Sequence, residues 1–395
     1  MSTGPSSGAA PQPRVPRART ARPGRRAETY AHRGSSGSAP ENTTAAFLLA
    51  IAEGADHVET DVQLSADGEL VIIHDVTLVR TTDARRVFPD RAPWRVHDFT
   101  LAELRMLDAG GWYDGRFGGE RIPTLDEVLD LLDGQVGLNL ELKSPDANPG
   151  LVAALAARLR TRREWVGANR LVVGSFDRPA LRDLHARLPD VAVSLISYEV
   201  PTGDELADLA GWVCSVNPDV RRLHPEDADR VTGAGLALVP WTVDAPRWWR
   251  WALDLGVTGM ITNYPAALAG LLDGRDPVPG GAGVVIEDVA YDSPGQPVLL
   301  RNVSERPVDV GGWYLRNQAS ERIPVGHGGV VAPGGRLRVP TGPGAVWNKA
   351  YGDSAGLHRA DGTLVDLYAY VVGGGVGPAP GSAGPTRAGQ PTDLL

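Results

Sequence analysis

Short apolar runs alternate with helical patterns from residue 28 to residue 272, and this alternation constrains the fold of the chain more than any other feature. Strands that alternate with helices pair in parallel, because each helical crossover returns the chain to the end of the sheet at which the previous strand began. Eight such units are the number in a closed (β/α)8 barrel, so we expect an α/β fold of the TIM-barrel type. The expected strands span residues 29–32, 57–64, 136–143, 171–175, 191–197, 212–217, 236–243 and 259–262.

One irregularity interrupts the alternation between the second and third strands. A hairpin-like run at residues 69–74 follows the turn Asp67-Gly68, and a long segment then precedes the next strand. Because a hairpin pairs antiparallel, this region predicts a small insertion that leaves the barrel. Elsewhere the expected helices include residues 43–53, 125–132, 151–160, 179–187 and 225–233.

The pattern changes after a linker at residues 273–283 that is rich in glycine and proline. Alternation with period two and turns of glycine and proline then predict a small antiparallel β-sandwich within residues 284–371. Residues 1–27 and 372–395 show no hydrophobic periodicity, so we expect both tails to be disordered. The strands expected in the sandwich span residues 284–291, 298–303, 312–315, 336–339 and 364–370.

The distribution of charge and cysteine excludes several classes of protein. The net charge is −9, yet the first 26 residues hold six arginines and no acidic residue, so the remaining chain is more acidic still. An acidic surface repels phosphate backbones, and we expect no nucleic-acid partner. The single cysteine, Cys214, excludes an internal disulfide and a cysteine-based zinc site.

No run of 18 apolar residues occurs, and no apolar stretch follows the basic N-terminus. The sequence therefore predicts neither a membrane-spanning helix nor a secretory signal. Together with the lone cysteine, this favours a cytoplasmic location without excluding export.

Polar clusters lie at the carboxyl ends of the expected strands, which form the catalytic face of a (β/α)8 barrel. His32 and Arg33 end the first strand, whereas the following Pro-Glu-Asn-Thr segment is explained by capping of a helix by Asn42 or Thr43. On the second strand, Glu59 and Asp61 are two residues apart and therefore share a face. Two carboxylates inside a barrel repel each other unless a cation lies between them.

Two further clusters complete this set. His74 ends an apolar run and precedes an aspartate, a position suited to proton transfer. In the third strand, strict alternation places Asn139, Glu141 and Lys143 on one face. The chain has only two lysines, Lys143 and Lys349, so an inward-facing lysine next to a glutamate is notable.

These residue types suit the cleavage of a phosphodiester. Carboxylates without cysteine favour one hard divalent cation, Mg²⁺ or Ca²⁺, with Mn²⁺ as a third candidate. Such a cation polarises phosphoryl oxygens, arginine and lysine neutralise them further, and two histidines move protons to and from the entering and leaving oxygens.

The motifs resemble those of glycerophosphodiester phosphodiesterases over about residues 28–272. His-Arg-Gly, Pro-Glu-Asn-Thr, Glu-x-Asp-Val, Ser-x-Asp-Gly, His-Asp and Glu-x-Lys occur in the order and spacing of that family. The resemblance implies a TIM-type barrel and hydrolysis of glycerophosphodiesters to glycerol 3-phosphate and an alcohol. One departure is Asn263, where the family often has aspartate. By matching position, the implied roles are metal ligation by Glu59, Asp61 and Glu141, acid/base catalysis by His32 and His74, phosphate binding by Arg33 and Lys143, and an apolar pocket wall at Trp241.

The C-terminal segment resembles a lamin-tail domain, an immunoglobulin-like sandwich. The resemblance rests on runs such as Gly312-Trp313-Tyr-Leu, Val346-Trp347-Asn348 and Gly352-Asp-Ser-Ala-Gly. It implies an accessory or anchoring role without catalysis, for a partner that the sequence does not identify. We expect Trp313 and Trp347 to lie in the core of the sandwich.

Two alternatives to glycerophosphodiester hydrolysis remain. Related barrels share the two-histidine and metal arrangement, so one alternative is a phospholipase D-like or cyclising activity on lysophospholipids. The other is a noncatalytic binding protein acting through the β-sandwich. The sequence leaves open which histidine is the acid, and whether water or a neighbouring hydroxyl of the substrate attacks.

Overall fold

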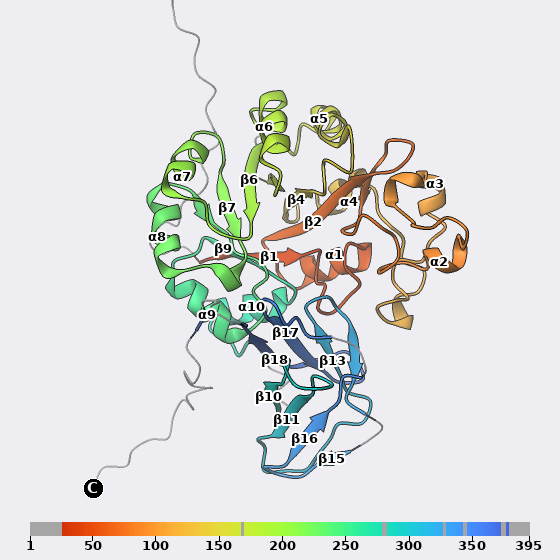
Figure 1. Ribbon diagram of the computed structural model, residues 1–395, viewed down its shortest axis with the longest axis vertical. Helices are drawn as coiled ribbons and strands as arrows, with labels where there is room; N and C mark the ends of the chain where they lie inside the picture. The colour runs from red at the N-terminus through yellow and green to blue at the C-terminus, as the bar shows by residue number, and fades with distance from the viewer. Residues whose placement is uncertain are drawn as a thin grey trace, which may run out of the picture.

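The computed structural model describes residues 26–166, 170–278, 283–326, 329–342, 346–372 and 377–378. Within them the chain forms a parallel barrel and a smaller antiparallel β domain that contact each other (Figure 1). Most of the two tails expected to be disordered, and residues 279–282 of the expected linker, lie outside the described residues. Among the helices described, none is long and apolar enough to cross a membrane.

Eight parallel strands form the barrel, in the order β8-β7-β6-β5-β4-β2-β1-β9. The amide of Thr258 donates to the carbonyl of Leu238 (2.8 Å) and that of Ile261 to the carbonyl of Pro240 (3.0 Å), which joins the two ends of this order. The predicted TIM-type barrel is therefore confirmed. Its strands are β1 (Glu28–His32), β2 (His57–Leu64), β4 (Gly137–Leu142), β5 (Leu171–Ser175), β6 (Ala192–Ser197), β7 (Ser215–Pro218), β8 (Ala237–Leu238) and β9 (Gly259–Thr262).

Strand β8 is much shorter than the expected run of residues 236–243. Pro240 has no amide hydrogen and cannot donate to a ladder, so regular pairing ends before it. Hydrophobicity alone did not distinguish this short strand from the irregular apolar segment that continues it.

Helices surround the barrel and cover the outward faces of the strands (Figure 1). On β2, Val58 and Val62 belong to the main core, whereas Glu59 and Asp61 alternate with them and face the interior. Thr43 begins the first helix by accepting a hydrogen bond from the amide of Ala46. The helices are α1 (Thr44–Ala52), α4 (Leu125–Leu132), α5 (Leu151–Thr161), α6 (Arg178–Arg187), α7 (Gly203–Leu209), α8 (Pro225–Gly233), α9 (Pro246–Asp254) and α10 (Pro265–Leu272).

The expected insertion between the second and third barrel strands is present. Strand β3 (Leu70–Ile72) pairs antiparallel with β2. The segment that follows has its own small core, which includes Val71, Phe99 and Leu104. Its helical turns are α2 (Ala84–Val87), η1 (Val96–Asp98), α3 (Leu101–Leu104) and η2 (Gly115–Phe117).

The C-terminal β domain consists of antiparallel sheets, as expected for a β-sandwich. Trp313 and Trp347 are 6% and 1% exposed, so both lie in its core as predicted. The first sheet has the order β10 (Val284–Val289), β11 (Val298–Asn302), β16 (Arg336–Val339). The second sheet has the order β14 (Arg322–Pro324), β13 (Tyr314–Asn317), β17 (Asp353–His358), β18 (Leu364–Tyr370). In the third, β12 (Val308–Asp309) pairs with β15 (Val330–Val331).

Arg316 of β13 joins the β domain to the barrel. Its side chain is 1% exposed and donates hydrogen bonds to the carbonyls of Tyr113 (2.9 Å) in the insertion and Ser320 (2.7 Å). The guanidinium also lies 3.5 Å from the centre of the Tyr113 ring. A charged donor in this position satisfies two carbonyls and stacks on an aromatic face at once.

Substitution Arg316→Met is expected to lower the free energy of unfolding by about 2–4 kcal/mol, because two buried carbonyls lose a charged donor. Urea denaturation of the full chain measures this loss. Arg322→Met is the matched control, since Arg322 is 43% exposed and lies 3.5 Å from Asp114 at the same interface. An exposed ion pair contributes less than about 1 kcal/mol, so equal losses for the two variants would contradict the assignment.

Candidate active site

The registers of β1, β2 and β4 bring the predicted polar residues to one place. His32 lies opposite Glu59, and Asp61 lies opposite Glu141. Directly opposed residues in neighbouring parallel strands project from the same side of the sheet. The four side chains therefore meet inside the barrel near the carboxyl ends of these strands.

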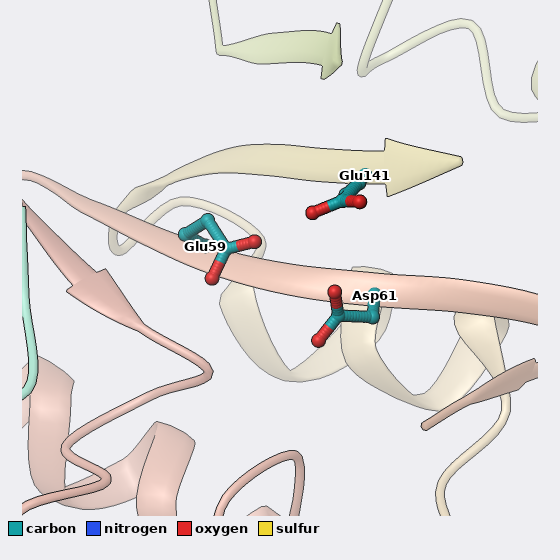
Figure 2. A group of neighbouring side chains, drawn as sticks. All are labelled: Glu59, Asp61 and Glu141. Carbon is teal, nitrogen blue, oxygen red and sulfur yellow. The ribbon is translucent and has the colours of Figure 1, made fainter. Parts of the chain in front are cut away.

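Glu59, Asp61 and Glu141 form a compact group of carboxylates. One oxygen from each lies within 4.8 Å of the others, and all three side chains are buried or nearly so. Figure 2 shows the carboxylates of Glu59 and Asp61 on β2 converging with that of Glu141 on β4. The predicted metal-ligand residues are thus brought together.

The chemistry of this group fits a divalent cation. The buried Oδ1 atom of Asp61 makes no hydrogen bond. Burial and the neighbouring charges of Asp61 and Glu141 raise the pKa of Glu59 well above its usual range. A hard cation bound by the three carboxylates would satisfy the free lone pair of Asp61 and relieve the repulsion between the carboxylates.

Arg33 and Lys143 surround the carboxylate group with positive charge. The Lys143 amine donates to Glu141 (2.7 Å) and lies 3.5 Å from Asp61 Oδ1. The Arg33 guanidinium lies 3.6 Å from Asp61 Oδ2, and its backbone amide donates to Glu59 (3.0 Å). Arg33 adopts a left-handed conformation with φ of 53°, a sparsely populated region that residues of functional sites often occupy.

The Nδ1 atom of His32 contacts an amide oxygen and not a carboxylate. Its Nδ1 lies 2.7 Å from Asn263 Oδ1, and its Nε2 lies 4.0 Å from Glu59 Oε2. Burial and the charge of Arg33 lower the pKa of His32 to about 3, against the opposing effect of Asn263. This imidazole is therefore neutral at pH 7.

His74 follows β3 and has a charged partner. Its Nδ1 lies 2.7 Å from Asp75 Oδ1, and Arg80 donates two hydrogen bonds of 2.8 Å to the same carboxylate. Despite burial, His74 and Arg80 hold the pKa of Asp75 well below its usual range. Gln63 of β2 places this loop by donating to the carbonyls of residues 73 to 75.

Several residues of the site were not predicted from the sequence. Arg80 also donates to Glu41, and the Glu41 carboxylate accepts from Arg33 as well. Asn42 donates to Asp61 (2.9 Å), whereas helix capping falls to Thr43. The Pro-Glu-Asn-Thr motif was the available signal, but capping explained it. Arg80 carried no signal in the sequence.

Trp241 lies in a cluster of aromatic rings at the same end of the barrel. Its ring centre is 5.8 Å from that of Phe176 and 5.9 Å from that of Tyr198, and its indole nitrogen donates to Asn217. Phe176 and Tyr198 directly follow β5 and β6 and are 38% and 56% exposed. The cluster therefore presents apolar surface at the carboxyl ends of the strands.

Comparison with known proteins identifies both parts of the chain. Residues 32–267 match the model of the glycerophosphoryl diester phosphodiesterase family, and residues 277–372 match the lamin tail domain. A glycerophosphodiester phosphodiesterase from Caldanaerobacter subterraneus is 37% identical over 244 residues, which are 61% of this chain and 96% of that protein.

Solved structures agree with this match. A putative glycerophosphoryl diester phosphodiesterase from Silicibacter pomeroyi has a TM-score of 0.56 and 31% identity, over 63% of this chain and 95% of its own. An Oleispira antarctica phosphodiesterase in complex with the product sn-glycerol-3-phosphate has a TM-score of 0.55 and 31% identity, over 63% and 97%. The chain is therefore an enzyme of the glycerophosphoryl diester phosphodiesterase family, and its C-terminal segment is a lamin tail domain.

Proposed function

We propose that this protein hydrolyses glycerophosphodiesters to glycerol 3-phosphate and an alcohol. The observation that carries this proposal is the meeting of Glu59, Asp61 and Glu141 with His32 at the strand ends. The complex of the Oleispira antarctica phosphodiesterase with sn-glycerol-3-phosphate supports the same product. A noncatalytic role for the chain has no comparable support.

Glu59, Asp61 and Glu141 would hold one divalent cation, Mg²⁺ or Ca²⁺, with Mn²⁺ as a third candidate. When bound, such a cation polarises phosphoryl oxygens and neutralises the charge that develops on them. Asn42 and Arg33 keep Asp61 turned toward this position.

His32 is suited to act as the general base. Its Nδ1 donates to a neutral amide, which stabilises an imidazolium less than a carboxylate would, and its Nε2 keeps a free lone pair. That nitrogen would take the proton from the attacking hydroxyl, of water or of the glycerol itself, while the hydroxyl oxygen forms a bond to phosphorus. Attack by the glycerol hydroxyl would give a cyclic phosphate, and water would then open this ring to give glycerol 3-phosphate.

His74 is suited to act as the general acid. The ionised carboxylate of Asp75 accepts from its Nδ1 and stabilises the protonated imidazole. Its Nε2 would then give a proton to the alcohol oxygen as the bond from that oxygen to phosphorus breaks. The two histidines thus differ in partner, and the partner determines the role.

The remaining predicted residues would bind the substrate. Lys143 and Arg33 supply positive charge beside the carboxylates, where the phosphate oxygens would lie. Trp241, with Phe176 and Tyr198, would form an apolar wall for the alcohol or glycerol portion.

A panel of glycerophosphodiesters and lysophospholipids, assayed with Mg²⁺, Ca²⁺ or Mn²⁺, tests the proposal. We expect release of glycerol 3-phosphate and the free alcohol from water-soluble diesters. Phosphorus NMR of the products separates a linear from a cyclic phosphate. Turnover of lysophospholipids alone would instead support the phospholipase-like alternative, and no turnover of any diester would contradict the proposed function.

A further inference from the structure

The lamin tail domain reaches a residue that lies behind the active site. Ser354 of β17 donates a hydrogen bond from its hydroxyl to Asp244 Oδ2 at 3.0 Å. Ser354 and Asp244 are 5% and 1% exposed, so the contact is buried at the junction of the two domains. Asp244 lies between β8 and α9, at the end of the barrel that carries the catalytic residues.

Four donors surround the Asp244 carboxylate. Oδ1 accepts from the amide of Asn263 (2.8 Å) and the hydroxyl of Thr262 (3.1 Å), and Oδ2 accepts from Asn263 Nδ2 (2.8 Å) and Ser354. Burial raises the pKa of Asp244 to about 6, although the hydrogen bonds from Asn263, Ser354 and Thr262 oppose the rise. At neutral pH this group is a carboxylate that only accepts hydrogen bonds.

A partner that only accepts determines the orientation of the Asn263 amide. The Asn263 nitrogen must face Asp244, so its oxygen must face the other way. That oxygen lies 2.7 Å from both His32 Nδ1 and the hydroxyl of Ser36. His32 therefore carries its proton on Nδ1 and leaves Nε2 as the free base.

We propose that Ser354 is a positioning residue for His32: its hydroxyl holds Asp244 Oδ2 against Asn263 Nδ2, so that the lamin tail domain contributes to setting the tautomer of the catalytic base. The inference rests on the role of His32 in the proposed function. It goes beyond the accessory or anchoring role that the sequence implies for this domain, because a hydroxyl of the sandwich completes the network behind the base.

A second contact between the domains reaches the same amide. The hydroxyl of Ser320 in the lamin tail domain donates to the carbonyl of Ser36 (3.3 Å), and the hydroxyl of Ser36 donates to Asn263 Oδ1 (2.7 Å). These two routes from the sandwich to the barrel thus end at Asn263, one on each side of its amide group.

The approach of β17 to this segment depends on a glycine. A Cβ atom on Gly356 would lie 2.2 Å from the hydroxyl of Tyr264, the residue that follows Asn263. Tyr264 is 5% exposed and has little room to move. Gly356 thus allows the sandwich to lie directly against the end of β9.

The network also explains why residue 263 is asparagine. An aspartate there would place a second carboxylate within 3 Å of Asp244, and two such groups cannot both ionise at that distance. An amide donates to Asp244 and accepts from His32 at the same time. Asparagine in place of the aspartate that the family often has at position 263 is therefore compatible with a carboxylate at Asp244.

The test compares wild-type protein with Ser354→Ala in the full chain. Selective ¹⁵N-histidine labelling reports which ring nitrogen of His32 is protonated, and this readout needs no turnover. We expect the wild-type ring to be protonated at Nδ1, and the variant to show a mixture of tautomers. With Mg²⁺ and glycerophosphocholine, we expect kcat to fall about 10- to 100-fold while KM and metal affinity are kept.

Two variants serve as controls. Ser354→Thr keeps the hydroxyl and should restore both the tautomer and kcat. Ser304→Ala removes a hydroxyl bonded to Asn302 within the sandwich and should change neither. If Ser354→Ala does not fold, Ser354→Cys keeps the side-chain volume with a weaker donor and is expected to give the same mixture.

An unchanged His32 tautomer in a folded variant that lacks the Ser354 hydroxyl would overturn the proposal, whatever happens to kcat. An altered tautomer with wild-type kcat would overturn it as well. If the wild-type enzyme turned over no diester while the tautomer still depended on Ser354, the positioning would stand and the proposed function would fail.

Discussion

Removal of divalent cations with excess EDTA is expected to reduce turnover of a glycerophosphodiester by about 10³-fold or more. Charge stabilisation by a bound cation contributes several kcal/mol to the transition state, and each 1.4 kcal/mol is about a factor of ten in rate. Readdition of Mg²⁺, Ca²⁺ or Mn²⁺ should restore the rate, and the order of recovery identifies the preferred cation. Undiminished turnover in EDTA would contradict the proposed site.

The ligand variants Glu59→Gln, Asp61→Asn and Glu141→Gln should each weaken cation binding and reduce kcat comparably. Each replaces a charged oxygen ligand with an amide of nearly the same size, so the barrel should remain folded. Isothermal titration with the metal alone measures the affinity. Glu127→Gln, where glutamine serves the capping box of α4 equally well, is the control and should bind like the wild type.

The variants His32→Ala and His74→Ala should each lower kcat on a natural diester by about 10²- to 10⁴-fold, the usual contribution of a positioned acid or base. Metal binding should be kept in both. His97→Ala is the control, because His97 is 40% exposed and pairs with Asp98 in the insertion. Its kcat should equal that of the wild type.

A substrate with an activated leaving group separates the two roles. A nitrophenolate needs little protonation as it leaves, so it should rescue the variant that lacks the acid. We expect rescue of His74→Ala and none of His32→Ala, because His74 pairs with the Asp75 carboxylate, whereas burial and the charge of Arg33 lower the pKa of His32 and keep it neutral. Equal rescue would show that this division is wrong, and the reverse pattern would exchange the roles.

Much of the fold and of the carboxylate group was predictable from local patterns. The two-residue periodicity of a strand predicts Glu59 and Asp61 on one face of β2 and Val58 and Val62 on the other, and the structure agrees. The alternation of strands with helices predicted the closed barrel of eight strands. Once neighbouring strands are known to be parallel, their carboxyl ends must meet at one edge.

The sequence placed an aspartate directly after His74, but it did not reveal that Asn263 contacts His32 or that Arg80 contacts Asp75. Arg80 lies in the insertion, and Asp244 and Asn263 lie near the end of the barrel, far from the motifs at β1 and β2. No periodicity links such segments, because their contacts follow from packing of the whole barrel. The same holds for β8, which Pro240 shortens within an apolar run.

The sequence by itself determined two segments of different periodicity and the candidate catalytic residue types carried by the first, since these are properties of local alternation and chemistry. Only the tertiary structure decided how the two segments face each other. Arg316, Ser320 and Ser354 contact the barrel through single side chains and a close approach of backbones. Such an interface depends on shape and hydrogen-bond direction in three dimensions, which a one-dimensional pattern does not contain.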